Sequence, residues 1–132
     1  MFELQIDFAK AIVHVKLTGF WTIDTVKAFM VAEQDAASEV VQACGRHFVL
    51  ADLMHFKIQA QESVALLQGL IGDSRYKAVR LAIVAGEGLA RIQIKRIMIR
   101  PGMRVFDSVE AAERWLVDDM AEDDRAASPL QG

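Results

Sequence analysis

The chain has 132 residues, a length typical of one domain that can bury a full hydrophobic core. Hydrophobic residues make up 53% and charged residues 25% of the sequence, as in soluble globular proteins, and the net charge of −3 argues against general nucleic-acid binding, which needs many cations to neutralise phosphates. The single cysteine, Cys44, excludes an intramolecular disulfide, no Cys/His cluster has the spacing of a zinc site, and we expect neither a metal nor a cofactor.

The first half of the chain predicts a hairpin followed by a long helix. Apolar and polar residues alternate over residues 2–8, the period of a half-buried edge strand, and residues 11–20 predict a second strand. The short link between them makes the pair an antiparallel hairpin. Residues 22–45 then predict a helix, with Thr22 as its N-cap and Gly45 at its end.

The second half of the chain predicts strands and helices in alternation. The predicted strands are 47–53, 78–86 and 103–106, and the predicted helices are 61–71, 89–100 and 107–116. The order is β-β-α-β-α-β-α-β-α, and repeated β-α units imply right-handed crossovers. We therefore predict an α/β fold with a mostly parallel five-stranded sheet, an antiparallel N-terminal edge strand and four flanking helices.

The two ends of the chain carry further expectations. The N-terminal segment MFELQIDFAK has Glu3 and Asp7 and no basic region before an apolar run, so it does not resemble a signal peptide. No stretch approaches the roughly 18 apolar residues of a transmembrane helix, and we expect a cytoplasmic protein. We place the domain at residues 1–117 and expect the acidic segment 118–132 to be a disordered tail.

Three stretches of the sequence carry a resemblance to a known family. VKLTGFWTIDTVKAF (15–29) has a strand that ends in Gly before a Thr-capped helix, FVLADLMHF (48–56) a central strand that ends in Asp, and RVFDSVEAAERWL (104–116) a closing strand and helix. Together they resemble the STAS domain, named for sulphate transporters and anti-sigma factor antagonists. The likeness spans about residues 2–117 and is greatest to the small bacterial branch grouped with CRAL-TRIO lipid-transfer domains.

The sequence departs from this family at the phosphorylation site. In anti-sigma factor antagonists the strand-ending Asp is followed by an Asp-Ser-Ser-Gly-like segment, in which one Ser accepts phosphate from a partner kinase. Counting from Asp52, Gln61 and Glu62 stand where those serines would be, and Ser63 falls at the Gly position. The phospho-acceptor is therefore not matched, and we do not transfer the phosphorylation switch to this chain.

Asp52 and His55 lie where the strand predicted at 47–53 ends. Parallel α/β sheets usually bind ligands at the carboxyl ends of their strands, which makes both residues candidates for a site. A catalytic base also needs a hydrogen-bonded partner and a shifted pKa, and the sequence shows no such partner. We favour the alternative that the Asp52 carboxylate accepts backbone N–H groups of the next loop and that His55 is a surface or partly packed ring.

Glu33 is a carboxylate inside an apolar stripe. It lies one helical turn from Met30 and one turn before Ala37, on the face expected to be buried. A buried carboxylate costs several kcal/mol unless it is paired, so it is rare in a plain core. Either the stripe is wide and Glu33 leans out or meets an Arg, or Glu33 is a functional polar residue in a pocket, for which it is our first choice.

The second and third predicted helices have more apolar residues than one buried face requires. The residues concerned are Leu66 and Leu70 of the second helix, and Arg91, Ile92, Lys95, Arg96 and Ile99 of the third. Such a surface suits a self-interface, a partner protein, an apolar ligand or an anionic membrane, unless the two helices cover each other. The cationic rim around an apolar centre also fits an amphiphile with an anionic head.

These patterns lead to three hypotheses about function. The first is a non-enzymatic regulatory or protein-interaction module of STAS-like type that works as a homodimer or through a protein partner. The second is a binder of a small apolar or amphiphilic, lipid-like ligand. The third, an enzyme, requires at least two of Asp52, His55 and Glu33 to converge in a cleft, and we rank it last.

Overall fold

The computed structural model describes residues 1–97 and 100–127, apart from the side chains of residues 97 and 119–127. The strands are β1 (Phe2–Asp7), β2 (Ile12–Gly19), β3 (Phe48–Phe56), β4 (Leu81–Val84) and β5 (Met103–Phe106). The helices are α1 (Ile23–Cys44), α2 (Gln61–Gly72), α3 (Leu89–Ile97) and α4 (Val109–Ala127). The element order is the predicted one.

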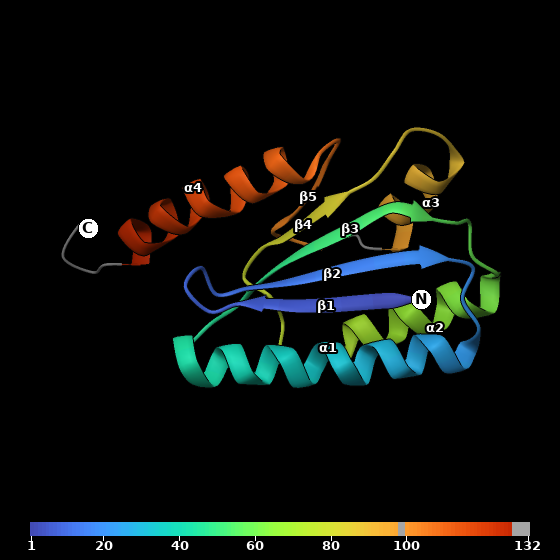
Figure 1. Cartoon of the computed structure of the whole chain (residues 1–132), viewed down its shortest axis with the longest axis horizontal. Helices are drawn as coiled ribbons and strands as arrows, with labels where there is room; N and C mark the ends of the chain where they lie inside the picture. The colour runs from blue at the N-terminus through green and yellow to red at the C-terminus, as the bar shows by residue number, and fades with distance from the viewer. Residues whose placement is uncertain (98–99, 128–132) are drawn as a thin grey trace.

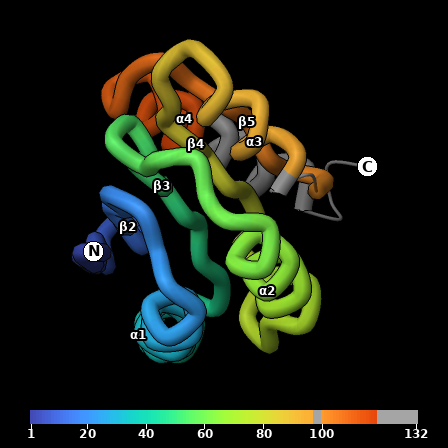
Figure 2. Tube along the Cα trace, turned by 90° about the vertical axis from the view of Figure 1, so that its right-hand side faces the viewer, coloured from blue at the N-terminus to red at the C-terminus, as the bar shows by residue number. Residues whose placement is uncertain are grey.

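The sheet has the strand order β1-β2-β3-β4-β5 (Figure 1). β1 pairs with β2 antiparallel, and every later pair is parallel. Figures 1 and 2 show α1 and α2 side by side on one face of the sheet and α4 on the other. The predicted fold class, a mixed sheet with an antiparallel N-terminal edge and four helices, is confirmed.

The caps of α1 are those expected from the sequence. The Thr22 side chain accepts a hydrogen bond from the Thr25 N–H at 3.2 Å, which satisfies one of the free donors at the helix start. Gly45 ends the helix with a φ of 85°, a left-handed conformation that costs glycine little. Val26, Phe29 and Met30 are buried, so the apolar stripe faces the sheet as its spacing predicts.

β3 is longer than the sequence pattern indicated. It runs to Phe56, which pairs with Gly19 of β2, whereas its pairing with β4 ends at Asp52. Asp52 and His55 therefore both lie within a strand, and the predicted loop position of His55 is wrong. The apolar run ends earlier than the strand because the last residues of β3 pair with β2 alone and are partly open to solvent.

α4 continues beyond the helix end predicted near residue 116. It runs to Ala127 and covers the segment from Asp118 that we expected to be disordered, up to that residue. Residues 128–132 lie outside the described part of the chain, and the domain boundary at residue 117 stays a prediction. Among residues 1–97 and 100–127, no helix combines the length and the apolar composition needed to cross a membrane.

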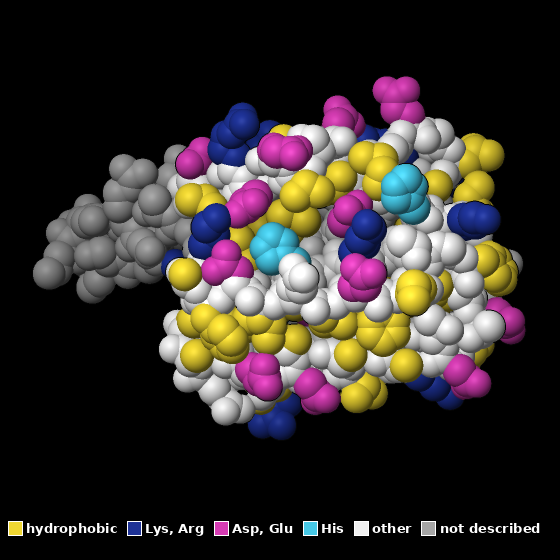
Figure 3. Space-filling model, in the orientation of Figure 1, with side chains coloured by type: hydrophobic (Ala, Val, Ile, Leu, Met, Phe, Trp, Pro, Cys, Tyr) yellow, Lys and Arg dark blue, Asp and Glu magenta, His cyan; other side chains and the backbone are white. Residues whose placement is uncertain are grey.

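α4 covers β3, β4 and β5 but leaves the outer face of the β1–β2 hairpin open. Ala112 and Leu116 of α4 are fully buried, and the Trp115 ring of the same helix lies 5.5 Å from that of Phe106. On the open hairpin face, Glu3 and Lys16 are exposed, and Figure 3 shows charged side chains of both signs there. This face is a solvated surface of the kind that antiparallel pairs carry.

Candidate functional site

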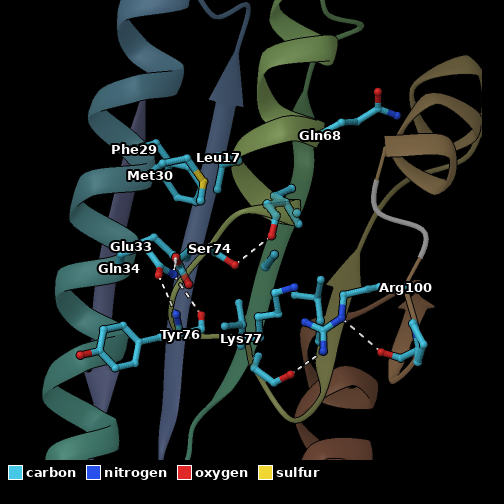
Figure 4. Close-up of a pocket in the computed structure, with 18 of the residues that line it drawn as sticks. Leu17, Phe29, Met30, Glu33, Gln34, Gln68, Ser74, Tyr76, Lys77 and Arg100 are labelled. Atoms are coloured by element: carbon cyan, nitrogen blue, oxygen red, sulfur yellow. Dashed lines mark hydrogen bonds between the residues drawn. The ribbon is translucent and has the colours of Figure 1, made fainter.

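A cavity of about 570 Å³ lies on the α1 and α2 side of the sheet (Figure 4). Its volume is in the range of roughly 300–1,000 Å³ usual for small-molecule sites. The apolar wall comes from alternate residues of β2 and β3 and from α1. These residues are Val15, Leu17, Phe29, Met30, Val49 and Ala51. Because alternate strand residues share a face, this wall is continuous with the core.

Polar and charged side chains line the rest of the cavity. They are Glu33 and Gln34 of α1, Gln68 of α2, Ser74, Tyr76 and Lys77 of the α2–β4 loop, Arg96 of α3, and Arg100 just before β5. Three cations and one carboxyl group therefore line the same cavity. Five segments of the chain supply these groups, and Gln68 donates a hydrogen bond to the Arg96 carbonyl at 3.4 Å, which ties α2 to α3 beside the cavity.

Glu33 of α1 lines this cavity. Burial raises the pKa of its carboxyl group, because the charged form loses water, and the Gln34 side chain partly offsets this by donating a hydrogen bond to Glu33 Oε2 at 2.7 Å. No cation is within salt-bridge distance of Glu33 in the part of the chain that the structure describes. Its carboxyl group is therefore available to a ligand.

The Gln34 amide joins α1 to the loop after α2. Its Oε1 accepts a hydrogen bond from the Tyr76 N–H at 2.9 Å, and its Nε2 donates to the Tyr76 carbonyl at 3.0 Å. Tyr76 lies outside the sheet, and these two bonds give its main-chain N–H and C=O groups the partners that a neighbouring strand would otherwise supply. Gln34 thus closes one end of the cavity with a fixed main-chain segment, which also holds Ser74 and Lys77 at its rim.

Arg100 is the most enclosed cation of the cavity. Its Nε donates to the Pro101 carbonyl at 3.1 Å, and its Nη2 donates to the Ala78 carbonyl. Burial lowers the pKa of the guanidinium. Arg100 has no carboxylate partner among the described residues, so the two carbonyls orient it while its charge stays uncompensated.

Asp52 and His55 do not reach this cavity. Because Ala51 lines it, Asp52 points to the opposite face of the sheet, where its Oδ1 accepts a hydrogen bond from the Met54 N–H at 3.1 Å. This is the kind of local backbone contact that the sequence favoured for Asp52. His55 is exposed near the end of β3. The enzyme hypothesis required at least two of Asp52, His55 and Glu33 to converge in a cleft, and the cavity that Glu33 lines contains neither Asp52 nor His55.

The basic residues predicted on the third helix have different surroundings. Arg91 donates to Asp107 Oδ1 at 2.8 Å and to the Ala85 carbonyl at 3.0 Å, which joins α3 to the start of α4. Lys95 and Arg96 are exposed, and only Arg96 lines the cavity. Ile92 is 48% exposed, and Ile99 lies outside the described residues.

Leu66 and Leu70 do not form a free apolar surface for a partner or a ligand. Both are half-buried and pack against the core, so the apolar surplus of α2 is largely used inside the fold. Leu70 also lines a groove between α1 and the α2–β4 loop, next to the cavity. Of the two alternatives for these leucines, the contacts favour packing between neighbouring elements.

Ser63, the serine nearest to the family's phospho-acceptor position, is buried. Its hydroxyl donates to the Trp21 carbonyl at 3.2 Å, and only 3% of the residue is exposed. Gln59 is also buried and accepts a hydrogen bond from the Trp21 N–H at 2.8 Å. These contacts tie the β3–α2 connection to the β2–α1 loop, and a kinase could not reach Ser63 without breaking them.

Sequence reasoning missed Gln34, Lys77 and Arg100 as members of the site. Gln34 and Lys77 have no distinctive motif, and their role depends on a loop contact between distant parts of the chain. Arg100 stands directly before Pro101, at the end of the predicted third helix. A cation next to a helix-ending proline is a weak signal that only the tertiary contacts make specific.

Comparison with known proteins addresses the fold. No protein-family model matches the chain, and no curated protein matches its sequence. The structure is similar to that of an uncharacterised protein of the DUF3478 family with a SpoIIAA-like fold from Shewanella loihica PV-4, with a TM-score of 0.66. That match covers 87% of this chain and 93% of the other at 16% identity. At this identity the likeness shows the fold alone, and the chain has a SpoIIAA-like, and thus STAS-like, fold.

Proposed function

We propose that this chain is a non-enzymatic binding module that holds a small amphiphilic molecule, with an apolar body and an anionic head, in the cavity lined by Glu33 and Arg100. The observation that carries the proposal is the cavity of about 570 Å³ with an apolar wall from β2, β3 and α1 and with three cations, Lys77, Arg96 and Arg100, in its lining. Lipid-like ligands have this division between body and head.

The apolar wall supplies the affinity for the body of the ligand. Val15, Leu17 and Phe29 line the cavity and are buried side chains, with 3%, 1% and 6% of their surface exposed. Removing ligand surface from water at such a wall gains about 25 cal/mol per Å² before the costs of binding are subtracted. A wholly polar ligand would leave this surface uncovered.

The cations supply the preference for an anionic head. Arg100 is partly buried, its charge is uncompensated, and its orientation is set by two carbonyl groups. A carboxylate or phosphate head would form charge-assisted hydrogen bonds with the remaining N–H groups of the guanidinium. Because these groups are already oriented, little rotamer entropy is lost on binding.

Titration calorimetry with dodecanoate, dodecanol and dodecyltrimethylammonium tests this proposal. We expect dodecanoate to bind and the cationic amphiphile not to bind. The Arg100→Gln substitution should weaken dodecanoate by roughly tenfold or more and remove its advantage over dodecanol. The comparison of the two ligands in one variant separates a lost charge contact from a general loss of stability.

Arg114→Gln is the matched control, because Arg114 is an exposed arginine on α4, on the opposite side of the sheet. It should leave both affinities unchanged. Native mass spectrometry of freshly purified protein should also show a retained small molecule. Dodecanoate that does not bind at all, or that binds Arg100→Gln as well as the original protein, would contradict the proposal.

A second candidate function, protein interaction through a homodimer, is favoured by exposed apolar residues at the carboxyl end of the sheet. These residues are Phe20, Met54, Ile58, Leu89 and Ile92, which are 61%, 38%, 49%, 70% and 48% exposed. Figure 3 shows hydrophobic side chains with Lys or Arg among them at the right-hand end of the molecule. Exposed aliphatic groups of this kind are common where a second chain binds.

Light scattering over a range of concentrations tests the homodimer. We expect a dimer that Leu89→Glu with Ile92→Glu converts to a monomer, because two charges would then be buried without partners. Val31→Glu, at a 64% exposed position on α1, should leave the dimer intact. A protein that stays monomeric at every concentration would rule out this second function and leave the ligand proposal untouched.

A further inference from the structure

We propose that the ligand of the cavity carries a hydroxyl group that donates a hydrogen bond to Glu33, in addition to an anionic head that binds Arg100. This inference rests on the proposed function and narrows its ligand class to hydroxylated anionic amphiphiles, such as hydroxy fatty acids. It follows from the free hydrogen-bonding capacity at the two ends of the cavity.

The Glu33 carboxyl group can accept more hydrogen bonds than the described residues donate to it. The only hydrogen bond that its carboxyl group makes with the described residues is to Oε2, from Gln34. The Gln34 amide cannot supply more, because Oε1 accepts from the Tyr76 N–H and Nε2 already donates to both Glu33 and the Tyr76 carbonyl. Glu33 lines the cavity, and its Oε1 has no hydrogen-bond donor among the described residues.

Glu33 and Arg100 lie at different places in the lining of the cavity. Figure 4 shows Glu33 on α1 at one side of the cavity and Arg100 at the other, with Lys77 between them. The apolar wall from β2 and β3 lies along the same cavity. One ligand that satisfies both residues therefore needs two polar groups, one for Glu33 and one for Arg100. A simple fatty acid would leave Glu33 facing methylene groups, which costs the desolvation of a polar group.

The charges that line the cavity favour a neutral hydrogen-bond donor on the ligand. An ammonium group on the ligand would be repelled by Lys77, Arg96 and Arg100, which line the same cavity. A hydroxyl group carries no charge and can donate to Glu33 in either protonation state. The raised pKa of the Glu33 carboxyl also indicates surroundings that disfavour charge, which suits a neutral partner.

Calorimetry with dodecanoate, β-hydroxydodecanoate and ω-hydroxydodecanoate tests the inference, because these probes differ only in the hydroxyl group and its position. We expect at least one hydroxy acid to bind roughly tenfold or more tighter than dodecanoate. Glu33→Leu should remove this preference, so that the hydroxy acids and dodecanoate bind that variant alike, and Glu33→Gln should keep part of it, since the Gln carbonyl oxygen still accepts.

Glu39→Leu is the matched control, because Glu39 is an exposed glutamate of the same helix. It should leave the preference for the hydroxy acid unchanged. Equal binding of all three probes, or a preference that survives in Glu33→Leu, overturns this inference and leaves the proposed function standing. Failure of every probe to bind overturns the proposed function and this inference with it.

Discussion

His47 is an ionisable side chain inside the core that lies outside the proposed site. Only 1% of it is exposed, and neither ring nitrogen has a hydrogen-bond partner among the described residues. Burial, and secondarily the positive charge of Arg100, lower the pKa of the ring below its usual value of 6.5. Protonation of the ring is therefore less favourable in the folded protein than in the unfolded chain, and its two nitrogen atoms have no partner among the described residues.

This environment predicts a stability that falls in mild acid. The His47 ring takes up its proton at a higher pH in the unfolded chain than in the folded protein. Protonation of His47 therefore does not oppose folding above about pH 6.5, and the free energy of unfolding decreases as the pH falls from there through the folded pKa. We expect His47→Leu to raise the free energy of unfolding at neutral pH by about 1 kcal/mol. We also expect the free energy of unfolding of this variant to decrease less between pH 7 and pH 5 than that of the original protein.

Urea denaturation at both pH values measures the effect. His55→Gln, at an exposed histidine, should behave as the original protein. A pH dependence that is the same with and without His47 would show that its ring does not control the acid response.

At the scale of elements, the side-chain amide of Gln34 links α1 to the α2–β4 loop. Gln34 makes two hydrogen bonds to the main chain of Tyr76. We expect Gln34→Ala to lower the free energy of unfolding by about 1–2 kcal/mol, because two main-chain groups lose their partner, and to speed hydrogen exchange at the Tyr76 N–H.

Gln42→Ala is the matched control for this substitution. Gln42 lies on the same helix, is exposed, and bonds only to the Ser38 hydroxyl. Its loss should change the stability by less than about 0.5 kcal/mol. Equal effects of the two substitutions would mean that the loop is not held by Gln34.

The turn into β5 depends on a glycine. Gly102 has a φ of 77°, and a Cβ atom there would lie 2.8 Å from the Val79 carbonyl oxygen. Since both the conformation and the space exclude a side chain, Gly102→Ala should lower the free energy of unfolding by about 1–3 kcal/mol in thermal or urea denaturation.

Gly69→Ala should have the opposite effect on the free energy of unfolding. Gly69 is inside α2 with no atom within 4 Å of an added Cβ, so alanine should stabilise the protein by up to about 1 kcal/mol. A Gly102→Ala protein as stable as the original would contradict the close approach of β5 to Val79.

At the scale of the whole molecule, ligand binding and folding are linked. The cavity is formed by parts of β2, β3, α1, α2 and the segment before β5, so it exists only in the folded chain. Dodecanoate at about one hundred times its dissociation constant should add about 2.7 kcal/mol to the free energy of unfolding. The melting temperature should rise by on the order of 10 °C.

Circular dichroism below the micelle concentration measures this shift. Ile71→Trp, which places a larger side chain into the cavity lining, should reduce the shift strongly. An unchanged shift in that variant would indicate that dodecanoate binds somewhere else on the protein.

The order of strands and helices could be predicted because it depends on local patterns. The alternation over residues 2–8, the cap at Thr22 and the end at Gly45 each act within a few residues, and the structure agrees with them. The end of β3 was misplaced because Phe56 pairs with Gly19, and such a pairing leaves no mark in the apolar run of β3 itself.

For the site, the sequence alone determined that Glu33 is an unusual carboxylate, since a charged group inside an apolar stripe violates the spacing rule at one position. It also determined the α/β order, because hydrophobic periodicity and caps are local properties. Only the tertiary structure decided that Glu33, Lys77 and Arg100 line one cavity and that Asp52 faces away from it. Those relations depend on which distant segments pack together, and packing is set by the sum of many weak contacts that no single stretch of sequence contains.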